Sequence, residues 1–370
     1  MNNGRFGVFF DPTKTTSGQR FYRDLCAALK TRSIPLDEKP SAILFNISAP
    51  VSEIVKAKIR GQKVVLRVDG LWWDRISPAF LENFWWPTRM LLTFFARFKM
   101  TQNITSDIAN LLDDNYTGFF RILLADHIVY QSVFSKQVHQ RYFPNKNHSV
   151  IGNASRSRQD IISSDYHETD LLKLCVIYSE APAKGIYQIL KFVKWLSEVK
   201  HLPVRLYVVG FNGKVPKYAP DDMQSLIMNS GLVDIYPPFD DFDPKVTKIL
   251  SEAHCCLCFS FRDPCPNAVV ESMAHHLPVV GIASGGVPEI VHDAGELIDW
   301  DDWKDGHFAA HRYEFQEKDI DFEQMFSALN KVLNNLNLYR MKVRQRLLDD
   351  LDVDVCAERY AQVLEKLAQE

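Results

Sequence analysis

The sequence has no strong excess of charge of either sign and no long segment of low complexity. It carries 43 Lys and Arg against 46 Asp and Glu in 370 residues, a formal net charge of −3. Nucleic-acid-binding domains usually show a basic excess, and disordered chains are poor in apolar residues. The hydrophobic fraction here is 46%. These values indicate a globular protein and argue against a nucleic-acid partner.

The amino-terminal segment lacks the long apolar run of a signal peptide. Its apolar stretch, Phe6 to Phe10, is short and fits a first strand. We therefore expect a cytoplasmic protein. In that compartment its seven cysteines are expected to be free thiols and not a disulfide framework.

Short apolar strands alternate with longer helical stretches in two sets, which is typical of doubly wound parallel sheets. The chain is too long for one usual core, so two domains are predicted, residues 1–155 and 170–351. The polar stretch 154–170 is the predicted linker. The predicted strands are 5–10, 42–47, 63–68, 127–130 and 148–152 in the first domain, and 172–178, 204–210, 232–236, 255–259, 278–282 and 295–298 in the second.

Two carboxylates, Asp263 and Glu271, lie eight residues apart across a turn and a predicted helix start. The Pro-Cys-Pro turn between them cannot be helical, whereas Asn267 is a good N-cap, so the helix should begin near Asn267. The N–H groups of a helix start attract phosphate. If a diphosphate bound at this helix start, one carboxylate could contact a sugar on one side of it and the other could contact a ribose on the other side. A nucleotide sugar would satisfy all three contacts.

The segment SFRDPCPNAVVESMAHHLPVVGIASGGVPEIV resembles the donor-binding signature of family 4 glycosyltransferases of the GT-B fold. That signature has an acidic residue, a turn often reading Pro-Asn, a hydrophobic helix start and a Glu at this spacing; Asp263 stands where Glu is usual. The segments GQKVVLRVDGLWW and ADHIVYQSVFSKQV resemble parts of bacterial family 4 enzymes that build surface polysaccharides. The alternative is the plain strand, turn and helix of any α/β protein.

The resemblance implies an α/β GT-B fold: two Rossmann-like doubly wound domains facing a central cleft, with a C-terminal helix, about 352–370, crossing back to the first domain. It also implies a retaining, metal-independent hexosyltransferase. The enzyme would move a sugar from a nucleoside-diphosphate sugar to a hydroxyl of a glycan acceptor, lipid-linked, in O-antigen (lipopolysaccharide) or capsule synthesis. The donor is a substrate, and no cofactor is implied.

By the same resemblance, Glu271 holds the nucleotide ribose, Asp263 holds the donor sugar hydroxyls, and Lys184 binds phosphate. The alternative for Lys184 is an exposed surface lysine. Relatives usually have an Arg shortly before the Lys, where this chain has Tyr178 and Ser179. Arg262 is the candidate replacement, because Arg suits phosphate geometry. The remaining expected donor contacts are Pro266, Asn267, Ala268, Val269, Gly285 and Gly286. A tight strand-to-helix turn alone would also need the two glycines.

Two further positions belong to the first domain. Asp69 follows the strand 63–68, and open α/β sheets place ligands at the carboxyl ends of strands. Many relatives have a His near this place, close to the reacting sugar, where this chain has Asp69. Asp69 is therefore expected either to contact the substrate in catalysis or to cap the next turn. Gly18 is expected to open the first helix, where it either lets a substrate approach the backbone or is a simple loop glycine.

The four cysteines between 255 and 265, beside His254, do not indicate zinc. Successive side chains of a strand point to opposite faces and cannot readily converge on one ion. No metal site is expected. The pair His275 and His276 is expected to end the helix that contains Glu271.

The segment 80–100, FLENFWWPTRMLLTFFARFKM, joins aromatic and apolar residues to Arg89, Arg97 and Lys99. It is too short and too charged to span a bilayer. It suits either a helix at a membrane surface or a first-domain helix buried against the sheet. The membrane alternative would place the protein on the inner face of the cell membrane and suit a lipid-linked acceptor.

Two other functions remain open at this stage. The same fold serves sugar-nucleotide epimerases, and the missing Arg and altered Asp263 would also suit a non-catalytic nucleotide-sugar-binding protein. The sequence does not identify the base, the sugar, the acceptor or the linkage.

Overall fold

The structure is a computed structural model of the chain. Of the described residues, those up to Gly152 and those from Val353 onward form one compact unit, and those from Asn153 to Asp352 form a second. Only the backbone is described for 17–20 and 244. The described residues are 5–10, 17–68, 86, 90, 117–140, 143–156, 166–167, 170–178, 184–213, 215, 220–228, 230–238, 244–300 and 319–370.

The first unit is built on a five-stranded parallel sheet in the order β1-β2-β3-β4-β5. The prediction of all five strands is confirmed, with ends trimmed by up to two residues. The strands are β1 Phe6–Val8, β2 Ala42–Asn46, β3 Lys63–Val68, β4 His127–Tyr130 and β5 His148–Val150.

The chain reverses its direction across this sheet at β1. From β1 it runs through α1 (Ser17–Leu29) to Ser33, which pairs in parallel with Phe6. It then crosses to the other side of β1, where Phe6 pairs with Ala42 of β2. Such a reversal is a topological switch point, beyond which open α/β sheets bind ligands. Gly18 is the second residue of α1, so it lies at this switch point.

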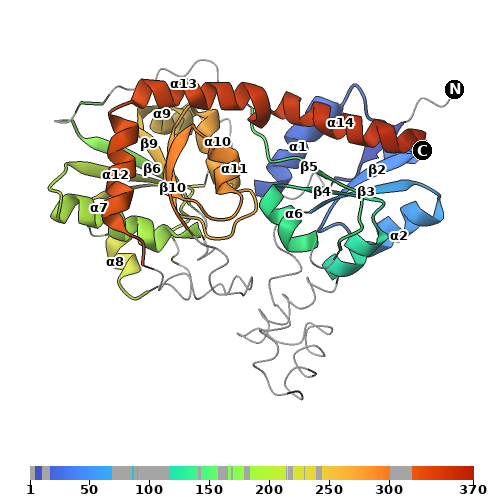
Figure 1. Ribbon diagram of the computed structural model, residues 1–370, viewed down its shortest axis with the longest axis horizontal. Coiled ribbons are helices and arrows are strands. Elements are labelled where there is room, and N and C mark those ends of the chain that lie inside the picture. The colour runs from blue at the N-terminus through green and yellow to red at the C-terminus, as the bar shows by residue number, and fades with distance from the viewer. Residues whose placement is uncertain are drawn as a thin grey trace. The chain divides into compact units, whose positions relative to one another are not determined.

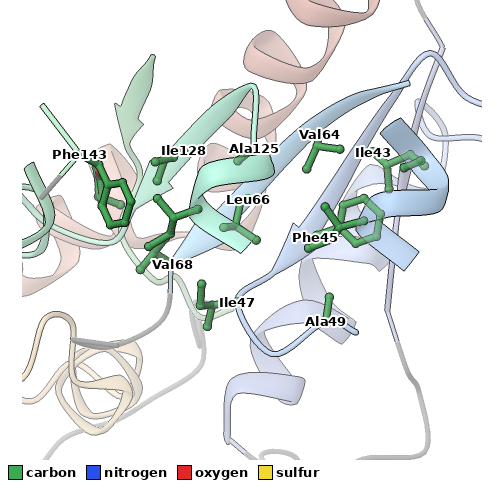
Figure 2. Close-up of a cluster of buried hydrophobic side chains, with 14 residues drawn as sticks. Ile43, Phe45, Ile47, Ala49, Val64, Leu66, Val68, Ala125, Ile128 and Phe143 are labelled. Carbon is green, nitrogen blue, oxygen red and sulfur yellow. The ribbon is translucent and has the colours of Figure 1, made fainter. Parts of the chain in front are cut away.

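Side chains at alternate strand positions point to opposite faces of the first sheet, and different helices cover these two faces. One face packs against α2 (Val51–Ile59) and the helical residues 117–124, and Figure 2 shows the resulting apolar cluster of Ile43, Phe45, Leu66 and Ile128. The opposite face carries α1 and the C-terminal helix α14 (Val353–Gln369), which lie against each other (Figure 1). The prediction that the last helix returns to the first domain is confirmed. The other short elements of this unit are the 3₁₀ turn η1 (Leu36–Glu38) and α6 (Val133–Gln140).

The second unit contains a six-stranded parallel sheet in the order β11-β10-β9-β6-β7-β8. All six strands fall where the apolar runs predicted them. They are β6 Leu172–Ile177, β7 Val204–Val209, β8 Val233–Tyr236, β9 Cys255–Cys258, β10 Val279–Ile282 and β11 Gly295–Ile298. The order reverses between β6 and β9. These strands are hydrogen-bonded neighbours, although Leu174 and its partner Cys255 lie 81 positions apart in the sequence.

Helices cover both faces of the second sheet. An apolar cluster joins α10, α11 and α13 on one face. The Phe192 ring of α7 contacts the Phe322 ring of α12, with centroids 5.4 Å apart and ring planes tilted by 52°. The helices are α7 Ile186–Glu198, α8 Met223–Met228, α9 Pro244–Glu252, α10 Asn267–Ala274, α11 Val287–Val291, α12 Phe322–Leu333 and α13 Leu336–Arg346, followed by the π-helical turn η4 Leu347–Leu351.

Two predictions fall largely outside the described residues. Asp69 is one of them, and the segment 80–100 is the other, apart from Trp86 and Met90, which are helical and exposed. Within the described ranges, no helix has the length and apolar character needed to cross a membrane.

Candidate functional site

Lys184 and Asp263 meet at the switch point of the second sheet. Lys184 follows β6 and Asp263 follows β9, and because these parallel strands are neighbours, their carboxyl ends lie side by side. The Nζ of Lys184 donates to Oδ2 of Asp263 in an ion pair. The structure therefore brings together two residues that lie 79 positions apart in the sequence and that the motif analysis singled out separately.

Gly185 is the residue that brings Lys184 to this place. Its φ of 66° lies in the left-handed region, and a Cβ on it would lie 2.2 Å from the carbonyl oxygen of Phe259, just after β9. Only glycine tolerates both the conformation and the close approach. The contact presses the start of α7 against the end of β9 and so places Lys184 beside Asp263.

Asp263 is held from its backbone and its side chain. The Cys265 N–H donates to Oδ1 over 3.0 Å, and the Gly286 N–H donates to the Asp263 carbonyl over 2.8 Å. Gly285, with a φ of 62°, lies so close that a Cβ would be 2.3 Å from the same carbonyl oxygen. The two glycines expected at the donor site thus approach the protein's own backbone, and this contact anchors the backbone of Asp263.

Helix α10 begins at Asn267, as predicted, but the prediction that Asn267 is its N-cap is wrong. The N-cap is Pro266, with φ −66° and ψ 114°. The side-chain oxygen of Asn267 accepts a hydrogen bond from Asn153 instead. The Val269 N–H donates to the Pro266 carbonyl over 3.0 Å, so the N–H groups of Asn267 and Ala268 are the ones at the start of α10 that an anion can use. Glu271 lies one turn inside α10 and is half-buried.

Burial and charge act on Lys184 in opposite directions. Burial lowers the pKa of its amine, and the neighbouring Cys258, Cys265 and Glu271 partly offset this by raising it. A cation in such a setting is stabilised by any anion that approaches it, since interactions between charges strengthen in a low-dielectric environment. Lys184 and the start of α10 together suit a phosphate-bearing ligand.

Tyr178 occupies the place where relatives have a phosphate-binding Arg, and Arg262 is the candidate replacement for that Arg. The two residues lie in different environments. Tyr178 is buried at the end of β6, and its ring meets that of Phe211 edge-on with centroids 4.9 Å apart. Arg262 is buried beside Asp263 with a left-handed φ of 50°, and its N–H donates to Ser284 Oγ over 2.7 Å. Ser179 lies outside the described residues.

One residue of the site escaped the sequence reasoning. Asn153, next to the predicted linker, is buried and bonds both to the backbone of Cys265 and to the side chain of Asn267. Its position three residues after β5 was the available signal, since polar residues just beyond the carboxyl ends of parallel strands often serve a site.

The remaining predictions about this region concern metal binding and the end of α10. In the part of the chain that the structure describes, no group of three or more His, Cys, Asp or Glu side chains could hold a metal ion. His275 is the C-cap of α10, and His276 adopts a left-handed φ of 60°, so the prediction that this pair ends the helix is confirmed.

Comparisons with known proteins agree with this architecture. Residues 173–312, less than half of the chain, match the family model described as "Glycosyl transferases group 1". Among curated protein sequences, none matches the chain.

Several solved structures share the fold at low sequence identity. HepE from Anabaena, in complex with UDP-glucose, is 14% identical with a TM-score of 0.56, and the match covers 98% of this chain and 99% of HepE. A glycosyltransferase from Rickettsia africae ESF-5 is 12% identical with a TM-score of 0.55 over 100% of both chains. The pneumococcal O-GlcNAc transferase GtfA, in complex with UDP and GlcNAc, is 12% identical with a TM-score of 0.55 over 89% of this chain. This chain spans only 57% of the GtfA chain. The protein therefore has the GT-B fold, and its match to group 1 glycosyl transferases includes both Lys184 and Asp263.

Proposed function

We propose that this protein is a glycosyltransferase that moves a sugar from a nucleoside-diphosphate sugar to a hydroxyl of a glycan acceptor. The observation that carries the proposal is the Lys184–Asp263 pair, which lies beside the start of α10 at the switch point of the second sheet. A cation next to a helix N-terminus suits a diphosphate. The group 1 match over this region and the neighbours solved with UDP or UDP-glucose support the assignment.

In this reaction the diphosphate binds to Lys184 and to the first amides of α10. Charge grows on the diphosphate as the sugar leaves it, and preorganised cations and N–H dipoles stabilise that charge. Because these groups already meet the charge, we assign no metal ion to the step. Glu271 holds the ribose hydroxyls. When phosphate replaces Asp263 as the partner of Lys184, the Asp263 carboxylate is left to accept hydrogen bonds from the donor sugar.

We assign retention of the anomeric configuration, as the resemblance of the Asp263 to Glu271 segment implies. The bond between the sugar carbon C1 and the diphosphate oxygen breaks, and the acceptor oxygen bonds to C1 on the same face. The acceptor proton passes to the departing phosphate oxygen. No protein nucleophile takes part, which is why neither carboxylate is assigned an attack on C1.

We further propose a lipid-linked acceptor and a role in bacterial surface polysaccharide synthesis, at the inner face of the cell membrane. The resemblance of the first-domain segments to polysaccharide-building enzymes supports this role. The mixed aromatic and basic composition of 80–100 suits contact with a membrane surface.

The first test is a thermal-shift panel with UDP, GDP, dTDP, ADP and CMP on the wild type and on Glu271→Ala. A ligand at about 100 times its Kd stabilises the folded state by about 2.7 kcal/mol. We expect one base to shift the wild type and a much smaller shift in the variant. No shift by any nucleotide at millimolar concentration would contradict the proposal.

Product analysis then separates the transferase from its alternatives. A transferase consumes the donor and forms a glycoside only when an acceptor is present. Epimerised or hydrolysed donor without acceptor would indicate an epimerase, and donor that binds without any turnover would indicate a binding protein.

A further inference from the structure

Asn153 is the first residue of the second unit. The chain enters this unit between Gly152 and Asn153 and leaves it between Asp352 and Val353. The two connecting segments run side by side, because the Ser155 N–H donates to the Leu351 carbonyl over 2.9 Å and Ser155 pairs with Asp352 in a parallel bridge. Asn153 therefore lies where the covalent connection becomes part of the second unit.

The side chain of Asn153 is 3% exposed and reaches the turn that precedes α10. Its Nδ2 donates to the Cys265 carbonyl over 2.9 Å and to Oδ1 of Asn267. Its backbone N–H also points to Sγ of Cys265, 3.3 Å away. An Asn amide carries two N–H bonds, so both are used on this one turn.

The turn needs such support from outside because of its composition. Pro264 and Pro266 have no N–H and cannot donate hydrogen bonds within it. The N–H of Cys265 is already committed to the Asp263 carboxylate. The two bonds from Asn153 therefore fix the orientation of the turn, and with it the direction of the first amides of α10.

We propose that Asn153 is a positioning residue for the donor site: it holds the Pro264–Asn267 turn so that the Asp263 carboxylate and the first amides of α10 converge on the diphosphate. This inference rests on the proposed function. The position requires asparagine. Aspartate has no N–H, serine has a single donor, and glutamine places its amide one carbon farther away. Asn153 also links the connection between the units to the donor turn through two hydrogen bonds.

The test compares Asn153→Ala and Asn153→Asp with Ser155→Ala as the matched control. Ser155 lies on the same connecting segment, and the bonds described for it are made by its backbone. Calorimetric titration with UDP, or with the nucleotide that gives the largest thermal shift, measures the donor-site Kd. Steady-state kinetics measure the KM of donor and acceptor separately.

We expect about tenfold weaker nucleotide binding in Asn153→Ala, from two lost hydrogen bonds. Asn153→Asp should bind more weakly still, because a carboxylate would face two oxygen acceptors. The donor KM should rise in parallel while the acceptor KM stays constant. A residue needed only for folding would lower the active fraction, and hence kcat, without this selective change. Ser155→Ala should bind like the wild type.

Equal nucleotide affinity in the wild type and both Asn153 variants would overturn the inference and leave the proposed function standing. No nucleotide binding by the wild type would instead refute the proposed function, and this inference with it. If the Asn153 variants do not fold, Asn267→Ala replaces them, since it removes the acceptor of the same bond and keeps the backbone amide. Unchanged affinity in Asn267→Ala would then overturn the inference.

Discussion

The two sheets each reverse at a switch point, but they equip it differently. In the second unit the carboxyl ends of β6 and β9 carry a lysine, a carboxylate and the start of α10. In the first unit the switch strand β1 is followed by α1, whose Phe21 and Tyr22 rings lie against the buried Arg67 guanidinium at 4.2 Å and 5.2 Å. One switch point presents charge toward a ligand, whereas the other surrounds a charge with aromatic rings. Topology marks where a site can form, and side chains decide whether it takes an anion.

The largest expected effect comes from Gly185→Ala, which breaks the second switch point. The added Cβ would lie 2.2 Å from the Phe259 carbonyl oxygen and would need a left-handed φ. We expect a loss of about 3–4 kcal/mol in the free energy of unfolding, measured with urea, and loss of nucleotide binding. Gly213→Ala is the matched control, since it shares a left-handed φ of 84° but has open space around it. It should lose about 1 kcal/mol. Equal losses would show that the close approach is unimportant.

Arg67→Ala tests the first switch point. It removes a large buried side chain and its stacking on Phe21 and Tyr22, so unfolding should become easier by about 2–3 kcal/mol. Nucleotide affinity should not change, because the site lies in the second unit. Arg60→Ala, at an exposed position, should alter neither quantity. Weaker nucleotide binding in Arg67→Ala would contradict the division of roles between the two switch points.

Lys184→Met keeps the length of the side chain and removes its charge. We expect nucleotide Kd to rise about 100-fold, since a charge-assisted bond to phosphate is lost. The free energy of unfolding should also fall, because the Asp263 carboxylate loses its ion-pair partner. Lys194→Met removes an exposed lysine of α7 and should leave Kd unchanged. Titration calorimetry decides, and a Kd within twofold of the wild type would remove Lys184 from the donor site.

Lowering the pH should reduce the folding stability of both units, because each contains a buried histidine. Burial lowers the pKa of His139 in the first unit and of His254 in the second to about 4. Because the unfolded chain binds these protons near pH 6.5, the stability that each contributes is complete above that pH and is lost as pH falls toward 4. For the fully buried His139 the loss is about 2 kcal/mol at pH 5. Thermal midpoints from pH 8 to 5 should fall less steeply in His139→Gln, and an unchanged slope would contradict this origin.

The strands could be predicted from the sequence because each is a short apolar run bounded by polar residues or turn formers. The start of α10 could also be predicted from local sequence, since the two prolines of the Pro-Cys-Pro turn exclude it from a helix interior. Asn267 was wrongly predicted to be the N-cap, because its side chain accepts a hydrogen bond from Asn153, which lies 114 positions earlier in the chain. The close approach of Gly185 to Phe259 could not be predicted from the sequence for the same reason. It arises only when two strands that are distant in the sequence become neighbours.

The return of α14 to the first unit has a consequence for how the protein is made. Residues up to Gly152 are translated before the second unit, whereas α14, the helix that covers α1 and β2, is translated after it. The whole second unit is translated in between. Folding of the first unit can therefore begin before the second unit is made but is completed only after α14 has been translated, and until then its α1 face remains an exposed apolar surface for chaperones to shield.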